Sequence, residues 1–137
     1  MVGAVELIRV DGLAPAVPYS YAATAPQDAR LVFLAGACPL DAEARTVAVG
    51  DLAGQTAACM ANLRTALAAA GATTDDLVFV RVLVASSDRA DLAAAWDLVH
   101  TAFDGHEPPG TLLGVAALGW EHQLVEVEAV AAVVDPS

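Results

Sequence analysis

Apolar and polar positions alternate along some stretches of the chain and recur every three to four residues in others, and Gly, Pro and Asp separate these stretches. Alternation, or a continuous run rich in Val, is typical of β-strands, because side chains of an extended chain point to opposite faces in turn. Strands are therefore expected at residues 4–10, 19–25, 31–36, 77–85, 111–118 and 124–134, and the pattern allows a further short strand at 45–49.

Two further stretches keep apolar residues at three-and-four spacing, which predicts two amphipathic helices. The first is expected to begin with Asp51 as its N-cap, to run to about Ala70 and to stop at Gly71. A carboxylate accepts from the free N–H groups of a first turn, and glycine adopts the left-handed conformation that closes a helix. The second helix is expected to begin at Ser87 or Asp88.

The order of strands, helix, strand, helix and strands favours an α+β protein with a single mixed β-sheet and both helices packed on one face. Residues 77–85 are almost continuously apolar, so this strand is expected to be covered on both faces. The sheet face away from the helices would be apolar and bare in a single copy. This predicts a homo-oligomer in which other copies cover that face.

Composition and charge narrow the classes of partner. Seventeen acidic residues oppose six arginines and no lysine, giving a net charge of -11, which does not suit a protein that grips nucleic acid. No apolar stretch approaches the roughly 18 residues that a membrane helix needs, so no membrane partner is expected. The first ten residues lack the cationic start and apolar core of a signal peptide, which predicts a cytoplasmic protein.

Length and cysteine usage add two expectations. The 137 residues fit one domain, residues 1–137. Cys38 and Cys59 have no CxxC spacing, and in a reducing compartment they are expected to be unpaired thiols.

Two carboxylates interrupt the last expected strand, "LVEVEAVAAVV". Glu126 and Glu128 should share one face, about 7 Å apart at about 3.4 Å of rise per residue. An ionised carboxylate is not buried without a partner, so each needs water, a cation or a polar cleft. Arg81 is the cation of the central sheet region, and an ion pair with Glu128 is expected. The alternative is that Arg81 reaches a ligand cleft.

Five segments occur in a characteristic order and spacing: "VPYSYA", "LVFLAGACPLD", "QTAACMANLRTALAAAG", "DDLVFVRVLVASSDRADL" and "LVEVEAVA". Together they resemble the Rid family, also called YjgF or RidA, from about residue 17 to residue 134. The resemblance implies a chorismate-mutase-like fold, assembled as a homotrimer with three clefts between neighbouring subunits. It also implies hydrolysis of reactive enamines and imines to the oxo acid and ammonia, with no metal and no bound cofactor.

The resemblance carries over to three site residues. Glu126 falls on the cleft glutamate of the family, which is proposed to position or activate water. Tyr19 matches the cleft tyrosine, and Gly36 lies at the glycine whose neighbouring backbone contacts the ligand.

Three other positions depart from the family pattern. Thr111 stands where an arginine clamps the substrate carboxylate in active members. A threonine hydroxyl does not replace a bidentate guanidinium, and the lost pair would weaken binding by about 2 to 3 kcal/mol. Leu113 stands at the position of the family's cysteine or hydrophobic residue, and Trp96 lies near where many members have Asn. Both changes make the cleft more apolar. The chain is therefore interpreted as an arginine-lacking member.

Other candidate residues have structural interpretations. Trp96 lies on the apolar stripe of its helix, so core packing is expected, with a ligand wall as the alternative. Cys38 is interpreted as a packing residue. The three histidines lack metal-ligand spacing, and His122 is the one considered as a rim residue because it precedes the Glu126 strand.

Three functions remain open from the sequence. The first is hydrolysis of a small, fairly apolar imine-like metabolite, with Glu126 directing water. The second is a noncatalytic module that binds a small ligand or a partner. The third is a cleft used for another step in a biosynthetic pathway, such as tautomerisation or cyclisation.

Overall fold

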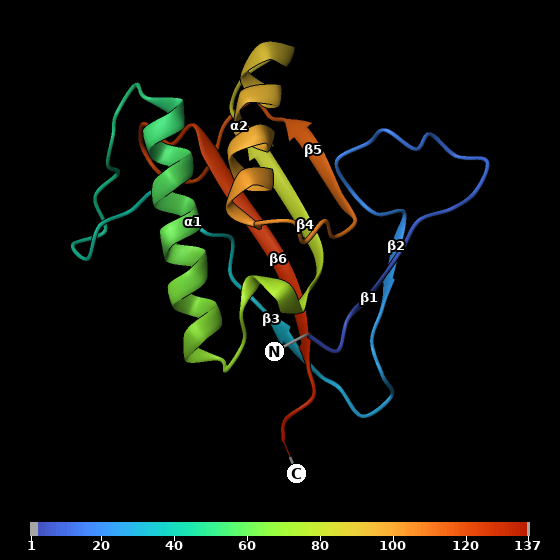
Figure 1. Ribbon diagram of the computed structural model, residues 1–137. Helices are drawn as coiled ribbons and strands as arrows, with labels where there is room; N and C mark the ends of the chain where they lie inside the picture. The colour runs from blue at the N-terminus through green and yellow to red at the C-terminus, as the bar shows by residue number, and fades with distance from the viewer. Residues whose placement is uncertain (1–2, 137) are drawn as a thin grey trace.

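The computed structural model describes residues 3–136, which form strands and helices in the expected order (Figure 1). The elements are β1 (Glu6–Ile8), β2 (Ala22–Thr24), β3 (Arg30–Phe33), α1 (Leu52–Ala69), a 3-10 turn (Thr74–Asp76), β4 (Leu77–Val84), α2 (Arg89–Ala102), β5 (Gly110–Gly114) and β6 (Val125–Val133).

Four strands form a mixed sheet in the order β3-β6-β4-β5. β6 is antiparallel to both β3 and β4, whereas β4 and β5 are parallel and are joined through α2. The expected α+β fold with two helices on a mixed sheet is confirmed, and Figure 1 shows α1 and α2 side by side on one face of that sheet.

Both helices begin where the sequence predicts. The Asp51 side chain accepts from the N–H of Gly54, and the Asp88 side chain accepts from the N–H of Ala90. Gly71 follows α1 with a φ of 75°, a left-handed conformation that favours glycine. The apolar sides of both helices pack on the valines of β4 and β6, and this core includes Leu63, Leu67, Val80, Val82, Val99, Val125 and Val127.

The first two strands differ from the expectation of a single sheet. β1 and β2 pair only with each other, as a separate two-stranded antiparallel sheet. The segment between them is tied to the chain before β5, because Ser20 N donates to Glu107 O at 3.0 Å and Arg9 pairs with the Glu107 carboxylate at 2.6 Å. Apolar alternation predicts a strand but not its partner, so the sequence did not distinguish these arrangements.

Several strands are shorter than expected, each for a local reason. β5 ends at Gly114, where its partner β4 ends at Val84. β3 ends at Phe33, because the chain leaves β6 after a last bond from Leu34 N to Ala129 O at 3.4 Å and forms its next bridge to β6 at Ala37. In place of a strand at 45–49, the structure has an isolated bridge that joins Leu40 and Thr46.

On the sheet face away from the helices, several apolar side chains are left exposed by the part of the chain that the structure describes. Phe33 is 74% exposed, Leu31 57% and Leu113 46%. Burial of apolar surface stabilises by about 25 cal/mol per Å², so this face is suited to association. Among residues 3–136, no helix is long and apolar enough to cross a membrane.

Candidate functional site

Strand register places Glu126 and Glu128 on the sheet face away from the helices, which we call the open face. Glu126 lies opposite Leu83 of β4, and Leu83 lies opposite Leu113 of β5. The neighbouring row consists of Glu128, Arg81 and Thr111. The shared face that the sequence predicted for the two carboxylates therefore exists, and Glu126 is a half-buried polar group in an apolar row.

Within residues 3–136, two side chains donate to the Glu126 carboxylate. Gln123 Nε2 lies 3.1 Å from Glu126 Oε1, and Cys38 Sγ lies 3.2 Å from the same oxygen. Gln123 comes from the loop before β6, which α1 holds through Gln55: its amide donates to His122 O at 2.9 Å and accepts from Leu124 N at 2.8 Å.

Gly36 lies against the Glu126 carboxylate. A Cβ built on Gly36 would overlap Glu126 Oε2 and would lie 2.7 Å from the carboxyl carbon. The chain can pass this close because it has left the β3 pairing and residue 36 has no side chain. The two residues are thereby brought into direct contact across neighbouring segments.

A pocket of about 320 Å³ lies beside Gly36 and Cys38, on the side toward α1. Asn62 of α1 fixes its wall by donating to Cys38 O at 2.9 Å and to Leu40 O at 3.1 Å. Trp120, which is 46% exposed, also lines this pocket.

Arg81 forms the ion pair with Glu128 that the sequence predicts, with Nη1 3.4 Å from Oε2. Its Nε also donates to Thr111 Oγ1 at 3.3 Å. Both charged side chains are 39% exposed, so solvent screens the pair and its contribution to stability is about 0–1 kcal/mol. Thr111 thus faces the same side of the sheet as Glu126, but its hydroxyl accepts from a neighbouring guanidinium.

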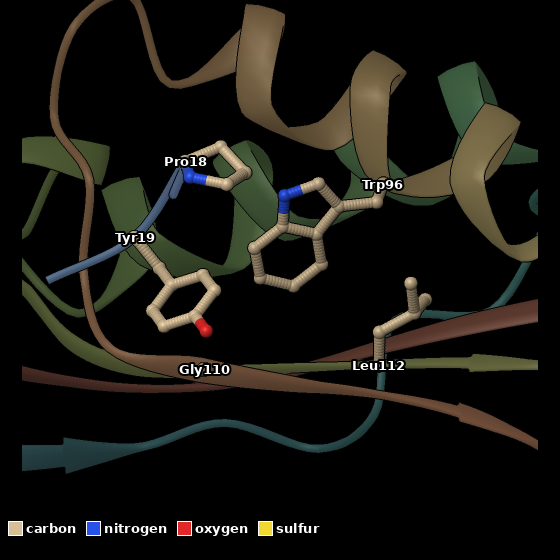
Figure 2. Close-up of a pocket in the computed structure, with 5 residues that line it drawn as sticks. All are labelled: Pro18, Tyr19, Trp96, Gly110 and Leu112. Atoms are coloured by element: carbon tan, nitrogen blue, oxygen red, sulfur yellow. The ribbon is translucent and has the colours of Figure 1, made fainter. Parts of the chain in front are cut away.

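Tyr19 and Trp96 lie together at a different place. Their rings meet edge to face, with centroids 6.4 Å apart, and they line a pocket of about 290 Å³ with Pro18, Gly110 and Leu112 (Figure 2). Trp96 also packs against the core, and its Nε1 is buried without a hydrogen-bond partner among residues 3–136. Core packing and a ligand wall are therefore compatible interpretations of this side chain.

The sheet separates these two groups within one chain. Leu112, in the floor of the Tyr19 pocket, pairs with Val82 and faces the helices together with Val127. Glu126 projects from the opposite face. A single copy brings Glu126 and Gly36 together, and Tyr19 and Trp96 together, but it does not unite the two pairs.

The cysteines are free thiols with raised pKa values. Burial, followed by the hydrogen bond to Glu126 and the charge of that carboxylate, raises the pKa of Cys38 to about 11. Burial raises the pKa of Cys59 to about 12. The nucleophilic form of cysteine is the thiolate, so both side chains are neutral thiols near pH 7, and Cys38 serves as a donor.

The side chains of the three histidines contact groups other than Glu126. His100 Nε2 contacts Glu107 Oε2 at 2.7 Å, and His106 Nε2 contacts the Leu77 carbonyl at 2.9 Å. The His122 side chain is 58% exposed and lies 3.5 Å from the Glu121 carboxylate. Among residues 3–136, no group of three His, Cys, Asp or Glu side chains could hold a metal ion.

Sequence reasoning missed two residues that contact Glu126. Cys38 was assigned to packing alone, but its thiol also reaches the carboxylate. Gln123 was not singled out, although a polar residue that is only 5% exposed must find partners. Its position three residues before Glu126 was the available signal.

Comparisons with known proteins show similarity over nearly the whole chain. A family model described as Endoribonuclease L-PSP matches residues 10–133. A RutC family protein of Pyrococcus horikoshii is 30% identical over 117 residues, covering 85% of this chain and 88% of the relative.

Solved structures are similar over nearly the whole chain. YyfB of Yersinia pestis, described as a protein of unknown function of the conserved Rid protein family, has a TM-score of 0.87 at 32% identity and covers 95% of this chain and 99% of its own. A member of the YjgF family from Mycobacterium tuberculosis has a TM-score of 0.62 at 29% identity, covering 94% and 99%.

Proposed function

Since this chain belongs to the Rid (YjgF/RidA) family, we propose that it binds a small, fairly apolar imine or enamine and hydrolyses it to a carbonyl compound and ammonia. One observation carries the proposal. The Glu126 carboxylate stands on an apolar sheet face, with one oxygen held by two donors and the other directed at the Gly36 backbone.

Glu126 would act on the water. Its carboxylate takes a proton as the water oxygen bonds to the imine carbon, and the C=N electron pair moves to nitrogen. The same proton then passes to that nitrogen, which gives the neutral carbinolamine. The carbinolamine hydroxyl next gives its own proton, through the Glu126 carboxylate, to the amine, and the C–N bond breaks to release ammonia while the carbonyl forms. Proton transfer by one positioned group contributes about 10²–10⁴-fold to the rate.

The site would be completed in a homotrimer. The open sheet face that carries Glu126 is apolar and uncovered in one copy, whereas Tyr19 and Trp96 line a pocket on the helix side near the β5 edge. A neighbouring copy that covers the open face would bring its own Tyr19 and Trp96 pocket toward Glu126. Clefts between subunits are therefore the arrangement in which all predicted site residues act together.

Thr111 and Leu113 would set the substrate class. Thr111 replaces a cationic clamp, and the nearby Arg81 is occupied by Glu128 and by Thr111 itself. Leu113 adds an exposed apolar side chain to the same face. The proposed substrate therefore lacks a carboxylate that must be clamped, and the chain forms one cytoplasmic Rid-like domain of the arginine-lacking type that needs no cofactor.

The absence of an arginine at residue 111 favours a second candidate, a noncatalytic module that binds a small ligand or a partner in the same clefts. A third is a cleft that catalyses tautomerisation or cyclisation. Nucleic acid is not a proposed ligand, because the net charge of -11 opposes binding to a phosphate backbone.

Ammonia release distinguishes these functions. Wild type, Glu126→Ala and Thr111→Arg are compared on freshly generated imines with and without a carboxylate, as rates above buffer hydrolysis. Glu121→Ala is the matched control, since that carboxylate is 88% exposed. Wild-type activity that Glu126→Ala removes and Glu121→Ala preserves supports hydrolysis. Activity that appears only in Thr111→Arg supports the second or third candidate.

A further inference from the structure

The two oxygens of the Glu126 carboxylate have different surroundings. Both donors, Gln123 Nε2 and Cys38 Sγ, reach Oε1. Among residues 3–136, no donor is found at Oε2, which instead lies over the Cα of Gly36. The carboxylate is therefore held through hydrogen bonds to Oε1, whereas Oε2 is left without a donor from these residues.

The Gln123 amide is fixed in one orientation by its partners. Its Oε1 accepts from Trp120 N at 3.1 Å, and its Nε2 donates to Val125 O at 3.0 Å as well as to Glu126. The reverse orientation would set an NH₂ group against the Trp120 N–H and an oxygen against both the Val125 carbonyl and the Glu126 carboxylate, which loses all three bonds. The side chain is 5% exposed, so water does not compete with these contacts.

Cys38 supplies the second donor from a segment that is distant in sequence. A neutral thiol has one proton to donate, and Sγ lies 3.2 Å from Glu126 Oε1 and 3.5 Å from Gly36 O. The carboxylate is the nearer and the charged acceptor, so it receives that proton. Asn62 holds the Cys38 backbone from α1 at 2.9 Å.

From this asymmetry we infer that Gln123 and Cys38 are positioning residues: they hold Glu126 by Oε1, so that Oε2 above Gly36 is the oxygen that exchanges a proton with water. The inference rests on the proposed function for its catalytic consequence, and on the contacts alone for its geometry. Fixing the acceptor oxygen matters, because a displacement of about 1 Å at a reacting group can reduce a rate by about 10²-fold.

A thiol titration tests the geometry without any substrate. The rate of Cys38 alkylation by iodoacetamide is measured against pH, with peptide mass mapping to separate it from Cys59, which is 0% exposed. Wild type should show a Cys38 pKa of about 11. In Glu126→Gln the carboxylate charge is gone, so the Cys38 pKa should fall toward its ordinary value of 9.0 and remain above it because burial persists.

Glu121→Gln is the matched control, because it removes one exposed carboxylate from the loop before β6. It should leave the Cys38 pKa at the wild-type value. A Cys38 pKa that is the same in wild type and in Glu126→Gln would overturn the inference.

Kinetics on the imine test the positioning role. Cys38→Ala should lower kcat about tenfold, equivalent to about 1.4 kcal/mol, with KM nearly unchanged because the substrate contacts remain. Cys38→Ser restores a donor and should recover most of kcat. Equal loss in the Ser and Ala variants, or no loss in either, would contradict a positioning role.

Gln123→Glu provides a second test that preserves shape but replaces the donor with an oxygen. It should lower kcat at least as much as Cys38→Ala, whereas the exposed Gln27→Glu adds the same charge and should not. Circular dichroism confirms that each variant is folded. If wild type releases no ammonia above the buffer rate, the proposed function fails. The thiol titration still tests whether Cys38 donates to the Glu126 carboxylate, because it needs no substrate.

Discussion

Replacing Gly36 with Ala tests how closely the backbone at residue 36 packs against the Glu126 side chain. The added Cβ would lie 2.7 Å from the Glu126 carboxyl carbon and 3.0 Å from its Cγ. Carbon atoms pack best at about 3.5–4.0 Å, so the Glu126 side chain or the backbone must move. The φ of Gly36 lies outside the left-handed region, so the effect is steric and not conformational.

The expected loss in the free energy of unfolding follows from the hydrogen bonds that Glu126 loses when it moves. A shift away from residue 36 breaks the hydrogen bonds from Gln123 and Cys38, and bonds to a charged group contribute about 1.5–3 kcal/mol each. Water replaces part of this, because Glu126 is half-buried. Gly36→Ala should therefore lower the free energy of unfolding by about 2 kcal/mol.

Gly119→Ala is the matched control. Its Cβ would meet no atom within 4 Å, and its φ is also outside the left-handed region. Its effect on the free energy of unfolding should stay within about 0.5 kcal/mol.

The assay is urea unfolding of Gly36→Ala, Glu126→Ala and the double variant at one fixed protein concentration, because association would otherwise shift the apparent stability. In the Glu126→Ala background the overlap is gone, so Gly36→Ala should destabilise by about 1–2 kcal/mol less than in wild type. Equal losses in both backgrounds would refute the reasoning, as would a Gly36→Ala variant that behaves like Gly119→Ala.

Two further predictions concern charged groups. The hydrogen bond from His100, followed by the charge of Arg9, holds the pKa of Glu107 below its ordinary value of 4.5. The stability that Glu107 contributes is therefore present above pH 4.5 and is lost as the pH falls through the pKa of Glu107 in the folded protein. Glu107→Gln should make Tm fall less steeply with decreasing pH in this acidic range. An unchanged slope of Tm against pH would contradict this prediction. Arg81→Met should remove at most about 1 kcal/mol of stability and leave imine hydrolysis within about twofold of wild type; a folded variant that loses ligand binding would instead show that Arg81 serves the cleft.

The elements with strong local signals were predictable. The near-continuous apolar run of β4, the caps at Asp51 and Asp88 and the shared face of Glu126 and Glu128 all follow from side-chain periodicity and capping chemistry. These features depend on residues close together in the chain. The resemblance then placed Gly36 at the site, and the structure puts it in contact with Glu126.

What the sequence did not reveal depends on long-range partners. The separate β1–β2 sheet is fixed by pairing that alternation does not encode. The hydrogen bond from Cys38 to Glu126 joins residues that are 88 positions apart. The placement of Tyr19 on the helix side of the sheet, away from Glu126, likewise arises from the link between Ser20 and Glu107.

The central claim is that copies of the chain close clefts around Glu126. Sedimentation equilibrium of wild type and Phe33→Asp, with ammonia release measured on the same samples, tests it most directly. Phe33 is 74% exposed on the open face, so a charge there should prevent association. The account predicts an active wild type of three 13.9 kDa chains and a folded, inactive single chain for Phe33→Asp. A wild type that sediments as one chain, or a single-chain Phe33→Asp with wild-type activity, would contradict it.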